Sequence, residues 1–465
     1  MVPIGIATLL MDPGVTTALT RHLAQYLHQG KEQERRAIQL TGTTLNLSIA
    51  ALISLTVFIL APQISEAFLR RPELGPLLRI ASLSILGQAL LNTSAAIFIG
   101  QQRMELQSLT SVLYAILKAI AMPALVYLGF SSGGAIMGHT ASILVAGAAG
   151  AILTLAFLKA GRDTPVAKFS TTEAKQLLRY GAPIYLSNLI GGGLNQLYGS
   201  LMVLYVTNDV IGNWGAAQNF GVLVAFLTVP ISTTLFPLFS KLEKGSTNLS
   251  HAFRSAVKYS SLIALPGAAA LIALSNPMIR IVYGADYPLA SDFFRLFLLT
   301  YLPIGIGSVC IPALLNGQGE TKIIFRINII TLIVGAPLSL TLIPTLGITG
   351  LITTMVTAPI PANLYATYWI RRNLNLEPDW RSSAKIYASS LTALAATLAT
   401  TTCLQLTPWL SLIIGGSVYT AVYAASIKLT RTLNGEDYRM FRLLIGDTGP
   451  LAHILNKIID IIEKN

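Results

Sequence analysis

Apolar segments long enough to cross a lipid bilayer follow one another along almost the whole chain, and this pattern restricts the fold more than any other feature. A spanning helix needs about 20 mostly apolar residues, and the stretches 45–60, 109–128, 135–156 and 323–342 approach or reach that length. In composition, 53% of residues are hydrophobic and only 11% are charged, against about 25% charged residues in an ordinary soluble domain. The sequence therefore predicts an all-α, polytopic transmembrane helix bundle.

About thirteen spanning helices are expected from the lengths of the apolar segments. They are predicted at residues 3–26, 41–62, 77–99, 109–128, 133–158, 182–206, 216–239, 256–274, 293–315, 323–342, 346–369, 386–404 and 410–427. Lys and Arg concentrate in every second connecting loop, as around Lys31 and Lys168, whereas the loops around Ser131 and Asn208 carry neither. Because short cytoplasmic loops carry the excess of Lys and Arg, the pattern predicts a multi-pass cell-membrane protein with a cytoplasmic C-terminus.

The net charge of +12 does not indicate a nucleic-acid partner. The basic residues are scattered over short loops and are not clustered with aromatic residues on one face. The two cysteines, Cys310 and Cys403, lie in separate apolar segments, where a thiol usually packs as a small hydrophobic group. No disulfide framework, metal site or cofactor is expected.

An internal duplication divides the chain. Gly30 aligns with Gly245, an offset of 245 − 30 = 215, and Gly100 aligns with Gly317, an offset of 317 − 100 = 217. Two copies that run in the same direction predict two pseudo-symmetric lobes related by an axis along the membrane normal. The expected parts are an N-terminal lobe of five spans, a C-terminal lobe of six, two additional spans and a cytoplasmic amphipathic tail, at residues 1–158, 159–372, 373–430 and 431–465.

Several sequence segments resemble those of a known family. They are the first span DPGVTTALTRHLAQYLHQGK, the repeat-junction segments IFIGQQRMELQ and LLNGQGETKI, and the segment RYGAPIYLSNLIGGGLNQL that opens the second lobe. With them, the chain resembles the Wzx-like polysaccharide flippases of the MOP (multidrug, oligosaccharidyl-lipid and polysaccharide) superfamily. The resemblance implies two six-helix lobes followed by two further helices, and this sequence departs from it by lacking the first helix. A start codon placed too late, a fragment or a shortened bundle would each explain the departure, and we favour the first.

The resemblance implies a transporter, and no enzyme, that flips lipid-linked oligosaccharide or polysaccharide precursors from the cytoplasmic to the outer leaflet by alternating access. Its expected partners are the lipid-linked glycan, the bilayer, a coupling ion (proton or sodium) and glycan-assembly enzymes. One alternative is an ion-coupled multidrug exporter of the same fold, which would need acidic residues in its cavity. The other is a polytopic glycosyltransferase, which would need catalytic acids on an outer loop.

Charged residues inside spans are the first candidates for the substrate site, because they normally face the interior of a bundle. Lys118 lies near the middle of its span and is expected to meet a substrate phosphate, or else to pair with a helix dipole or another side chain. Arg21 and His22 precede a basic loop and are expected to bind an anionic headgroup at the inner entrance. The alternative for both is that they extend to the membrane surface.

Amide side chains are the second group of substrate-binding candidates. Asn188 and Asn195 are seven residues apart, so they share one helix face, and Gln196 lies beside them. Gln218 and Asn219 open the next span. These amides are expected to bind sugar hydroxyls, with hydrogen bonding between helices as the alternative.

Four further residues are candidates for gating or ion coupling. Asp12 is a carboxylate inside the first span and suggests a coupling-ion site, unless Pro13 and Gly14 beside it only mark a helix break. Arg79 and Arg295 occupy equivalent places in the two copies, where they would close an outer gate or anchor the outer interface. His139 lies in an apolar span and is either a proton relay or a satisfied buried imidazole.

Overall fold

The computed structural model describes residues 2–68, 71–159, 169–404, 407–433 and 437. These residues form α-helices with short 3₁₀ and π-helical turns, and no β-strand is found among them, so the all-α prediction is confirmed. The contacts divide the chain into unit 1 (Met1–Ser200) and unit 2 (Leu201–Asn465). The predicted amphipathic tail lies, apart from its first residues, outside the described part of the chain.

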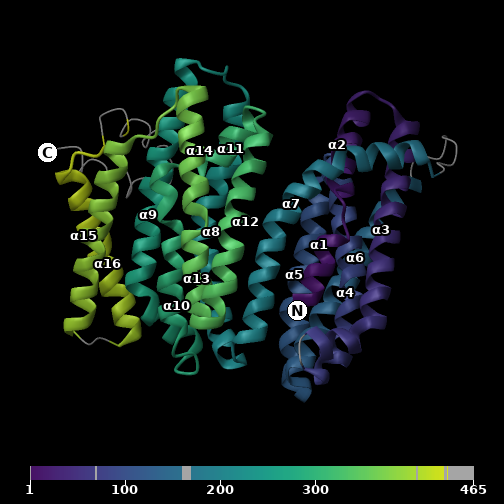
Figure 1. The fold of residues 1–465 in the computed structure, drawn as a ribbon, viewed down its shortest axis with the longest axis horizontal. Helices are drawn as coiled ribbons and strands as arrows, with labels where there is room; N and C mark the ends of the chain where they lie inside the picture. The colour runs from purple at the N-terminus through teal and green to yellow at the C-terminus, as the bar shows by residue number, and fades with distance from the viewer. Residues whose placement is uncertain (1, 69–70, 160–168, 405–406, 434–436, 438–465) are drawn as a thin grey trace. The chain divides into compact units, whose positions relative to one another are not determined.

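Unit 1 is built around α4, which packs against α2, α3 and α6. Its helices are α1 (Val2–Leu10), α2 (Val15–His28), α3 (Glu32–Gln63), α4 (Gly75–Gly100), α5 (Met104–Leu125), α6 (Ser131–Lys159) and most of α7 (Thr171–Tyr205), with short turns at Ile64–Phe68, Pro72–Leu74 and Val126–Phe130 (Figure 1). A Cβ atom added to Gly147 of α6 would lie 2.6 Å from the carbonyl oxygen of Gly87 in α4. Small residues therefore let these two helices approach closely, as in other membrane bundles.

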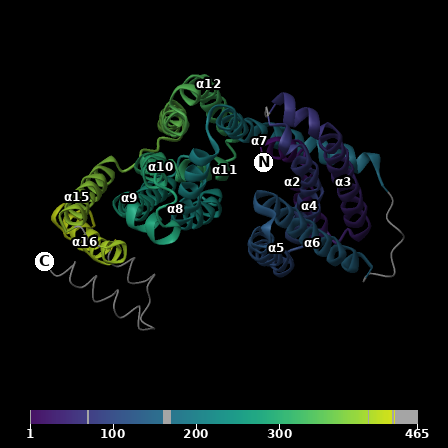
Figure 2. The same ribbon diagram turned by 90° about the horizontal axis from the view of Figure 1, so that it is seen from below.

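Unit 2 is built around α8 and α9. Its helices are α8 (Asn208–Ser240), α9 (Thr247–Tyr283), α10 (Ala290–Leu298), a 3₁₀ segment (Leu299–Ile306), α11 (Cys310–Gly317), α12 (Thr321–Leu346), α13 (Ile348–Thr357), α14 (Pro359–Leu374), α15 (Trp380–Leu404) and α16 (Pro408–Leu429). A buried cluster that includes Phe239, Phe253 and Leu314 joins α8, α9 and α11. Helices α15 and α16 pack on each other and on α9 (Figure 2).

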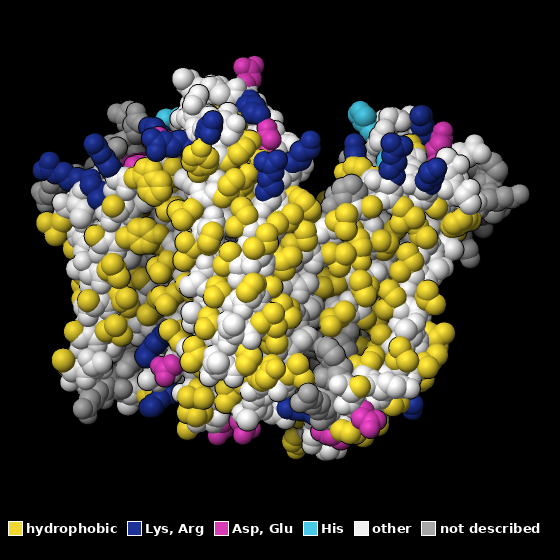
Figure 3. Space-filling model, viewed as in Figure 1, with side chains coloured by type: hydrophobic (Ala, Val, Ile, Leu, Met, Phe, Trp, Pro, Cys, Tyr) yellow, Lys and Arg dark blue, Asp and Glu magenta, His cyan; other side chains and the backbone are white. Residues whose placement is uncertain are grey.

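The flanks of the helices carry large apolar side chains that are exposed. Leu52 in α3 and Phe226 in α8 are 67% and 74% exposed, and Figure 3 shows hydrophobic side chains along the helices with Lys and Arg near their ends. Such a surface is unfavourable in water and favourable in lipid. The helices of each unit therefore have surfaces suited to a bilayer.

The expected number of thirteen spans is not confirmed. Among the described residues, seven helical stretches are long and apolar enough to cross a membrane, or eight if a bent pair is one span. One of the seven, residues 104–156, contains both α5 and α6, which pack against each other and are joined by a turn at Gly129, where φ is 94°.

Three spans predicted as continuous helices are interrupted. Residues 3–26 form α1 and α2, separated at Pro13 and at Gly14, where φ is 81°. Residues 293–315 bend by 47° near Gly307, where φ is 93°. Residues 346–369 are divided into α13 and α14 just before Pro359. Proline removes a backbone donor and glycine permits a positive φ, so these residues end helices locally.

The duplication recurs in the structure. The starts of four helices repeat at the predicted offset: α3 and α9 (247 − 32 = 215), α4 and α10 (290 − 75 = 215), α5 and α12 (321 − 104 = 217), and α6 and α13 (348 − 131 = 217). Residues with positive φ also coincide, as Gly30 with Gly245 and Gln102 with Gly319. The copies differ where α4 is one continuous helix and its counterpart is broken between α10 and α11.

Candidate functional site

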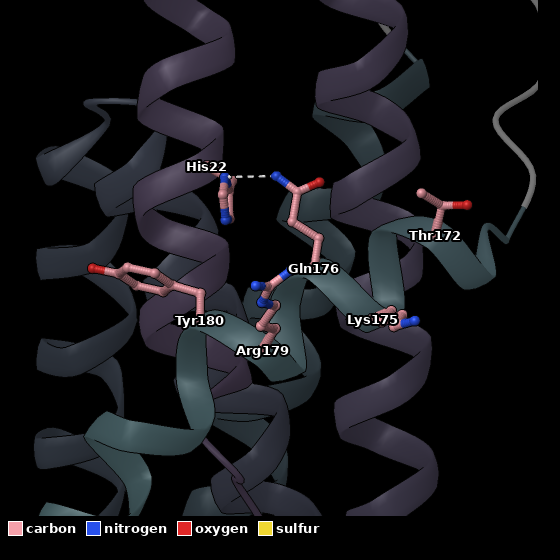
Figure 4. Close-up of a pocket in the computed structure, with 6 residues that line it drawn as sticks. All are labelled: His22, Thr172, Lys175, Gln176, Arg179 and Tyr180. Atoms are coloured by element: carbon pink, nitrogen blue, oxygen red, sulfur yellow. Dashed lines mark hydrogen bonds between the residues drawn. The ribbon is translucent and has the colours of Figure 1, made fainter.

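A pocket rich in cationic side chains lies between α2 and the first turns of α7 in unit 1 (Figure 4). Its cavity of about 610 Å³ is lined by His22, Thr172, Lys175, Gln176, Arg179 and Tyr180, and we call it the basic pocket. Lys175 and Arg179 are four residues apart on a helix, so they lie on one face of α7. Arg21 adds a third cation, because its guanidinium carbon lies 4.3 Å from the centroid of the Tyr180 ring.

Neighbouring groups fix the walls of this pocket. The side-chain nitrogen of Gln176 lies 3.3 Å from Nδ1 of His22 (Figure 4), and the rings of His22 and Tyr180 meet edge to face at 5.8 Å. The other ring nitrogen of His22, Nε2, is buried and has no hydrogen-bond partner among the described residues. It is therefore an unsatisfied polar atom in the wall of the pocket.

Glu173 lies on the same turns of α7 as Lys175 and Arg179, and the charged form of its carboxyl group is disfavoured. Burial raises the pKa of its carboxyl group above the ordinary value, and the nearby charge of Glu34 raises this pKa further. A raised pKa favours the neutral form. The pocket therefore keeps a net positive character suited to phosphate or carboxylate groups.

A second, smaller cavity lies farther along the same helices, beside the break between α1 and α2. Its volume is about 190 Å³, and its polar lining consists of Thr8, Asp12, Thr17, Asn92, Tyr185 and Asn188; we call it the polar cavity. One carboxylate oxygen of Asp12 accepts a hydrogen bond from the backbone N–H of Thr16 at 3.2 Å, and the other accepts from the Thr16 hydroxyl. Asp12 thus both stabilises the start of α2 and faces the cavity.

The two cavities share the contact between α2 and α7, which we call the α2–α7 seam. At this seam the backbones of Gly14 and Gly181 are in contact, so that a Cβ atom on either residue would overlap the backbone of the other. Tyr180 in the basic pocket and Tyr185 in the polar cavity are 185 − 180 = 5 residues apart, about 8 Å along a helix. The two cavities are therefore neighbours along α7.

The structure brings together only some of the predicted site residues. Arg21 and His22 meet at the basic pocket, and Asp12 and Asn188 meet at the polar cavity. Lys118 lines neither: it is exposed on α5, with its Nζ 5.8 Å from the centroid of the Tyr114 ring. The Tyr114 hydroxyl lies 3.3 Å from Nδ1 of His139 in α6, so these three side chains form a separate group.

The remaining predicted amides are not among the residues that line the basic pocket or the polar cavity. The amide of Asn195 donates to the Gly191 carbonyl at 3.2 Å, and Gln196 packs against Gly5 of α1. In unit 2, Gln218 is exposed, and Asn219 donates to the hydroxyl of Tyr283 at 3.0 Å.

The two equivalent arginines lie in different surroundings. The guanidinium of Arg79 lies 5.8 Å from the centroid of the Phe58 ring. Arg295 donates to the Ser275 hydroxyl at 2.7 Å and pairs with Asp292 at 3.2 Å. The Arg295 side chain thus has protein partners in α9 and α10.

Several residues of the site were not identified from the sequence. Lys175 and Arg179 fall between the predicted spans 133–158 and 182–206, in the basic loop around Lys168, but in the structure they lie in the first turns of α7. Their four-residue spacing just before an apolar segment was the available signal. Asn92 and Tyr185 were missed because single polar residues inside apolar segments are common.

Comparisons with known proteins agree with this architecture. A family model described as "Polysaccharide biosynthesis protein" matches residues 1–292. The "Probable flippase AglR" of Haloferax volcanii is 24% identical over 258 residues, which cover 54% of this chain and 52% of that protein. The "Lipopolysaccharide biosynthesis protein WzxC" of Escherichia coli K12 is 23% identical over 71% of this chain and 64% of that protein. The chain thus matches about half to two thirds of the length of these relatives.

A solved structure shares the fold over nearly the full length of both chains. It is titled "Lipid II flippase MurJ, inward closed conformation", and its TM-score is 0.76 at 17% identity, covering 96% of this chain and 92% of that one. Because the family model covers more than half of the chain, this protein, a multi-pass membrane protein, belongs to the polysaccharide biosynthesis protein family.

Proposed function

We propose that this protein moves a lipid-linked oligosaccharide or polysaccharide precursor from the cytoplasmic to the outer leaflet by alternating access. The observation that carries the proposal is the basic pocket, whose cations lie on the same helix pair as the polar cavity. The names of the relatives, a flippase and a lipopolysaccharide biosynthesis protein, support the same class of cargo. Transport by a binding site, without a catalytic step, explains this arrangement.

The physical need for such a path is the cost of burying a glycan headgroup in hydrocarbon. Sugar hydroxyls and a phosphate would lose water without replacement partners, at several kcal/mol for each unsatisfied group. In the proposed mechanism, Lys175, Arg179 and Arg21 bind the phosphate, while amides such as Asn188 bind sugar hydroxyls along the α2–α7 seam. The lipid tail stays in the bilayer, so only the polar part of the substrate is enclosed.

The orientation and the lobes are part of the proposal. The loops rich in Lys and Arg are assigned to the cytoplasm, which places the basic pocket at the inner face and the C-terminus inside the cell. Residues 1–158 and 159–372 act as the two lobes that alternate in access. Asp12 is proposed as the coupling-ion ligand, and Lys118 as a second contact for the headgroup.

The alternative functions find less support in the charges of the described cavities. A multidrug exporter for organic cations would need acidic cavity walls, whereas the basic pocket carries Lys175 and Arg179. A glycosyltransferase would need paired catalytic acids, and the only carboxylate that lines the basic pocket or the polar cavity, among the described residues, is Asp12. Transport of an anionic glycolipid remains the better match.

The proposal is tested by translocation of a fluorescent lipid-linked glycan in reconstituted vesicles. Replacing Lys175 and Arg179 together by Gln should slow translocation of the headgroup about tenfold or more, because each charged hydrogen bond contributes about 1.5–3 kcal/mol. Lys31→Gln removes an exposed cation outside the pocket and is the matched control. Equal rates for the double variant and the wild type would contradict the proposal.

A further inference from the structure

Unit 2 contains a third cavity that the proposed path does not use. It lies where α9 ends, the chain turns through residues 284–289 and α10 begins, at the end of α9 opposite the basic loop 241–246. Its volume is about 630 Å³, and its polar lining comes from Asn276, Arg280, Tyr287, Ser291 and Asp292. We call it the turn pocket.

The turn pocket is held in shape by its neighbours. The N–H of Leu289 donates to the side-chain oxygen of Asn213 at 2.9 Å, and Asn213, which is 7% exposed, donates in turn to the Asp209 carbonyl. This ties the turn to α8. The ring of Tyr287 lies 5.0 Å from that of Tyr283, so the aromatic wall is also fixed, and a fixed site loses little entropy when a ligand binds.

The chemistry of the lining fits a sugar better than an anion. Sugar hydroxyls both donate and accept hydrogen bonds, and the pocket offers an amide, a guanidinium, a hydroxyl and a carboxylate beside a flat tyrosine ring. For a phosphate, the carboxylate of Asp292 offsets the attraction of the Arg280 guanidinium in the same lining. The volume also falls within the range of about 300–1,000 Å³ typical of small-ligand pockets.

The duplicated copy shows that the fold does not require these side chains. With the offset of 215, Arg280, Tyr287 and Asp292 correspond to positions 65, 72 and 77 (280 − 215, 287 − 215 and 292 − 215). These positions hold Ser65, Pro72 and Leu77. In the first copy α4 begins at the place that corresponds to the start of α10 (290 − 215 = 75) without the polar set, so the set is specific to the turn of unit 2.

We propose that the turn pocket binds one or two sugar rings of a glycan. On the proposed orientation it opens to the outer face, where it would hold the glycan as the headgroup leaves the path. Only this placement rests on the proposed function, since the binding itself follows from the local side chains. Tyr287 provides the stacking surface, and Asn276 and Arg280 hold the hydroxyls.

Saturation-transfer NMR on the full chain in lipid nanodiscs tests the inference, with neutral, N-acetylated and uronic-acid disaccharides as probes at millimolar concentration. The wild type should transfer saturation to the ring protons of at least one probe. Tyr287→Ala should weaken that binding about tenfold, as expected for loss of a central aromatic contact. Tyr287→Phe keeps the ring and should preserve it.

Control variants separate this inference from the proposed function. Lys175→Gln with Arg179→Gln should lose glycolipid translocation and keep disaccharide binding, which would show that the turn pocket acts independently. Arg280→Gln, an exposed side chain on the last turn of α9, should weaken binding without affecting folding. No saturation transfer to any probe, or equal transfer in Tyr287→Ala and the wild type, would overturn the inference even if translocation is intact.

Discussion

The contact between Gly14 and Gly181 allows the stability of variants at the α2–α7 seam to be predicted. In Gly14→Ala the new Cβ atom meets the backbone of Gly181 while φ stays near 81°. A positive φ costs a non-glycine residue about 1–2 kcal/mol, and forced overpacking costs about 1–3 kcal/mol. The free energy of unfolding should therefore fall by about 2–5 kcal/mol, the sum of these two ranges.

Three other glycines separate the two costs. Gly30→Ala tests positive φ alone, because φ is 68° and no atom lies within 4 Å of the added Cβ, and it should cost about 1–2 kcal/mol. Gly181→Ala tests overpacking alone, because the backbone at Gly181 is helical. The higher helix propensity of Ala should reduce the loss in the free energy of unfolding by about 1 kcal/mol. Gly193→Ala, with open space around its Cβ, should be neutral or slightly stabilising.

Unfolding in detergent micelles, followed by circular dichroism, measures all four variants under one condition. The expected order of stability is Gly193→Ala, then Gly181→Ala and Gly30→Ala, then Gly14→Ala. In the double variant of Gly14 and Gly181 the loss should be less than the sum, because the helices are already separated by the first Cβ atom. If Gly14→Ala is no less stable than Gly30→Ala, the two helices do not cross at these residues.

Other features give independent predictions. Lys258 and Asp437 form a buried ion pair at 2.5 Å, so Lys258→Gln should lower the free energy of unfolding by about 3–5 kcal/mol; a loss below 1 kcal/mol, on the scale of an exposed pair, would show that the pair is solvated. The raised pKa of Glu173 means that the folded state binds the proton of this carboxyl group more tightly than the unfolded state does. The resulting contribution to the free energy of unfolding is fully present at low pH and is lost as pH rises through the pKa of the folded state. Glu173→Gln should therefore be more stable than the wild type at neutral pH, with the difference vanishing in acid; a constant difference would refute the burial of the carboxyl group. An impermeant maleimide added outside intact cells should label Ser131→Cys but not Lys31→Cys in a chain with Cys403 replaced by Ser, and the opposite result would invert the topology.

The repeating architecture was predictable because its signals are local. Apolar length, the alternation of Lys and Arg between loops, and landmarks such as Gly30 and Gly245 each depend on a few neighbouring residues. The break near Pro13 and Gly14 was also visible as an alternative, since both residues disfavour a continuous helix. These features gave the helical class and the duplication without any tertiary contact.

The break between α10 and α11 depends on distant residues and was missed. Pro303 and Gly307 lie within an apolar run that reads as one span, and proline and glycine are tolerated in spanning helices when neighbours satisfy the freed backbone groups. Here the partners come from α15: Ser383 donates to the Gly305 carbonyl at 2.7 Å, and the Tyr387 hydroxyl donates to the Leu302 carbonyl. No local pattern reveals a pairing between residues 383 − 305 = 78 positions apart.

The candidate site was only partly predictable for a similar reason. Arg21 and His22 were identified by their place at the end of a span. Lys175 and Arg179 line the same pocket as His22, but in the sequence they look like the basic residues that flank many spans and set their orientation. The packing of α7 on α2 turns these basic residues into the lining of a pocket, and the sequence alone does not show this packing. Lys258 and Asp437 show the same limit, because the two members of this ion pair are 437 − 258 = 179 positions apart in the sequence.

Cross-linking shows whether the basic pocket receives the anionic headgroup. A lipid-linked glycan with a photoreactive group beside its phosphate is illuminated with the reconstituted protein, and the modified peptides are identified by mass spectrometry. We expect label on residues 172–180 and beside His22, and less label when Lys175 and Arg179 are replaced by Gln. Label confined to other segments, such as the exposed face of α5 around Lys118, would contradict it.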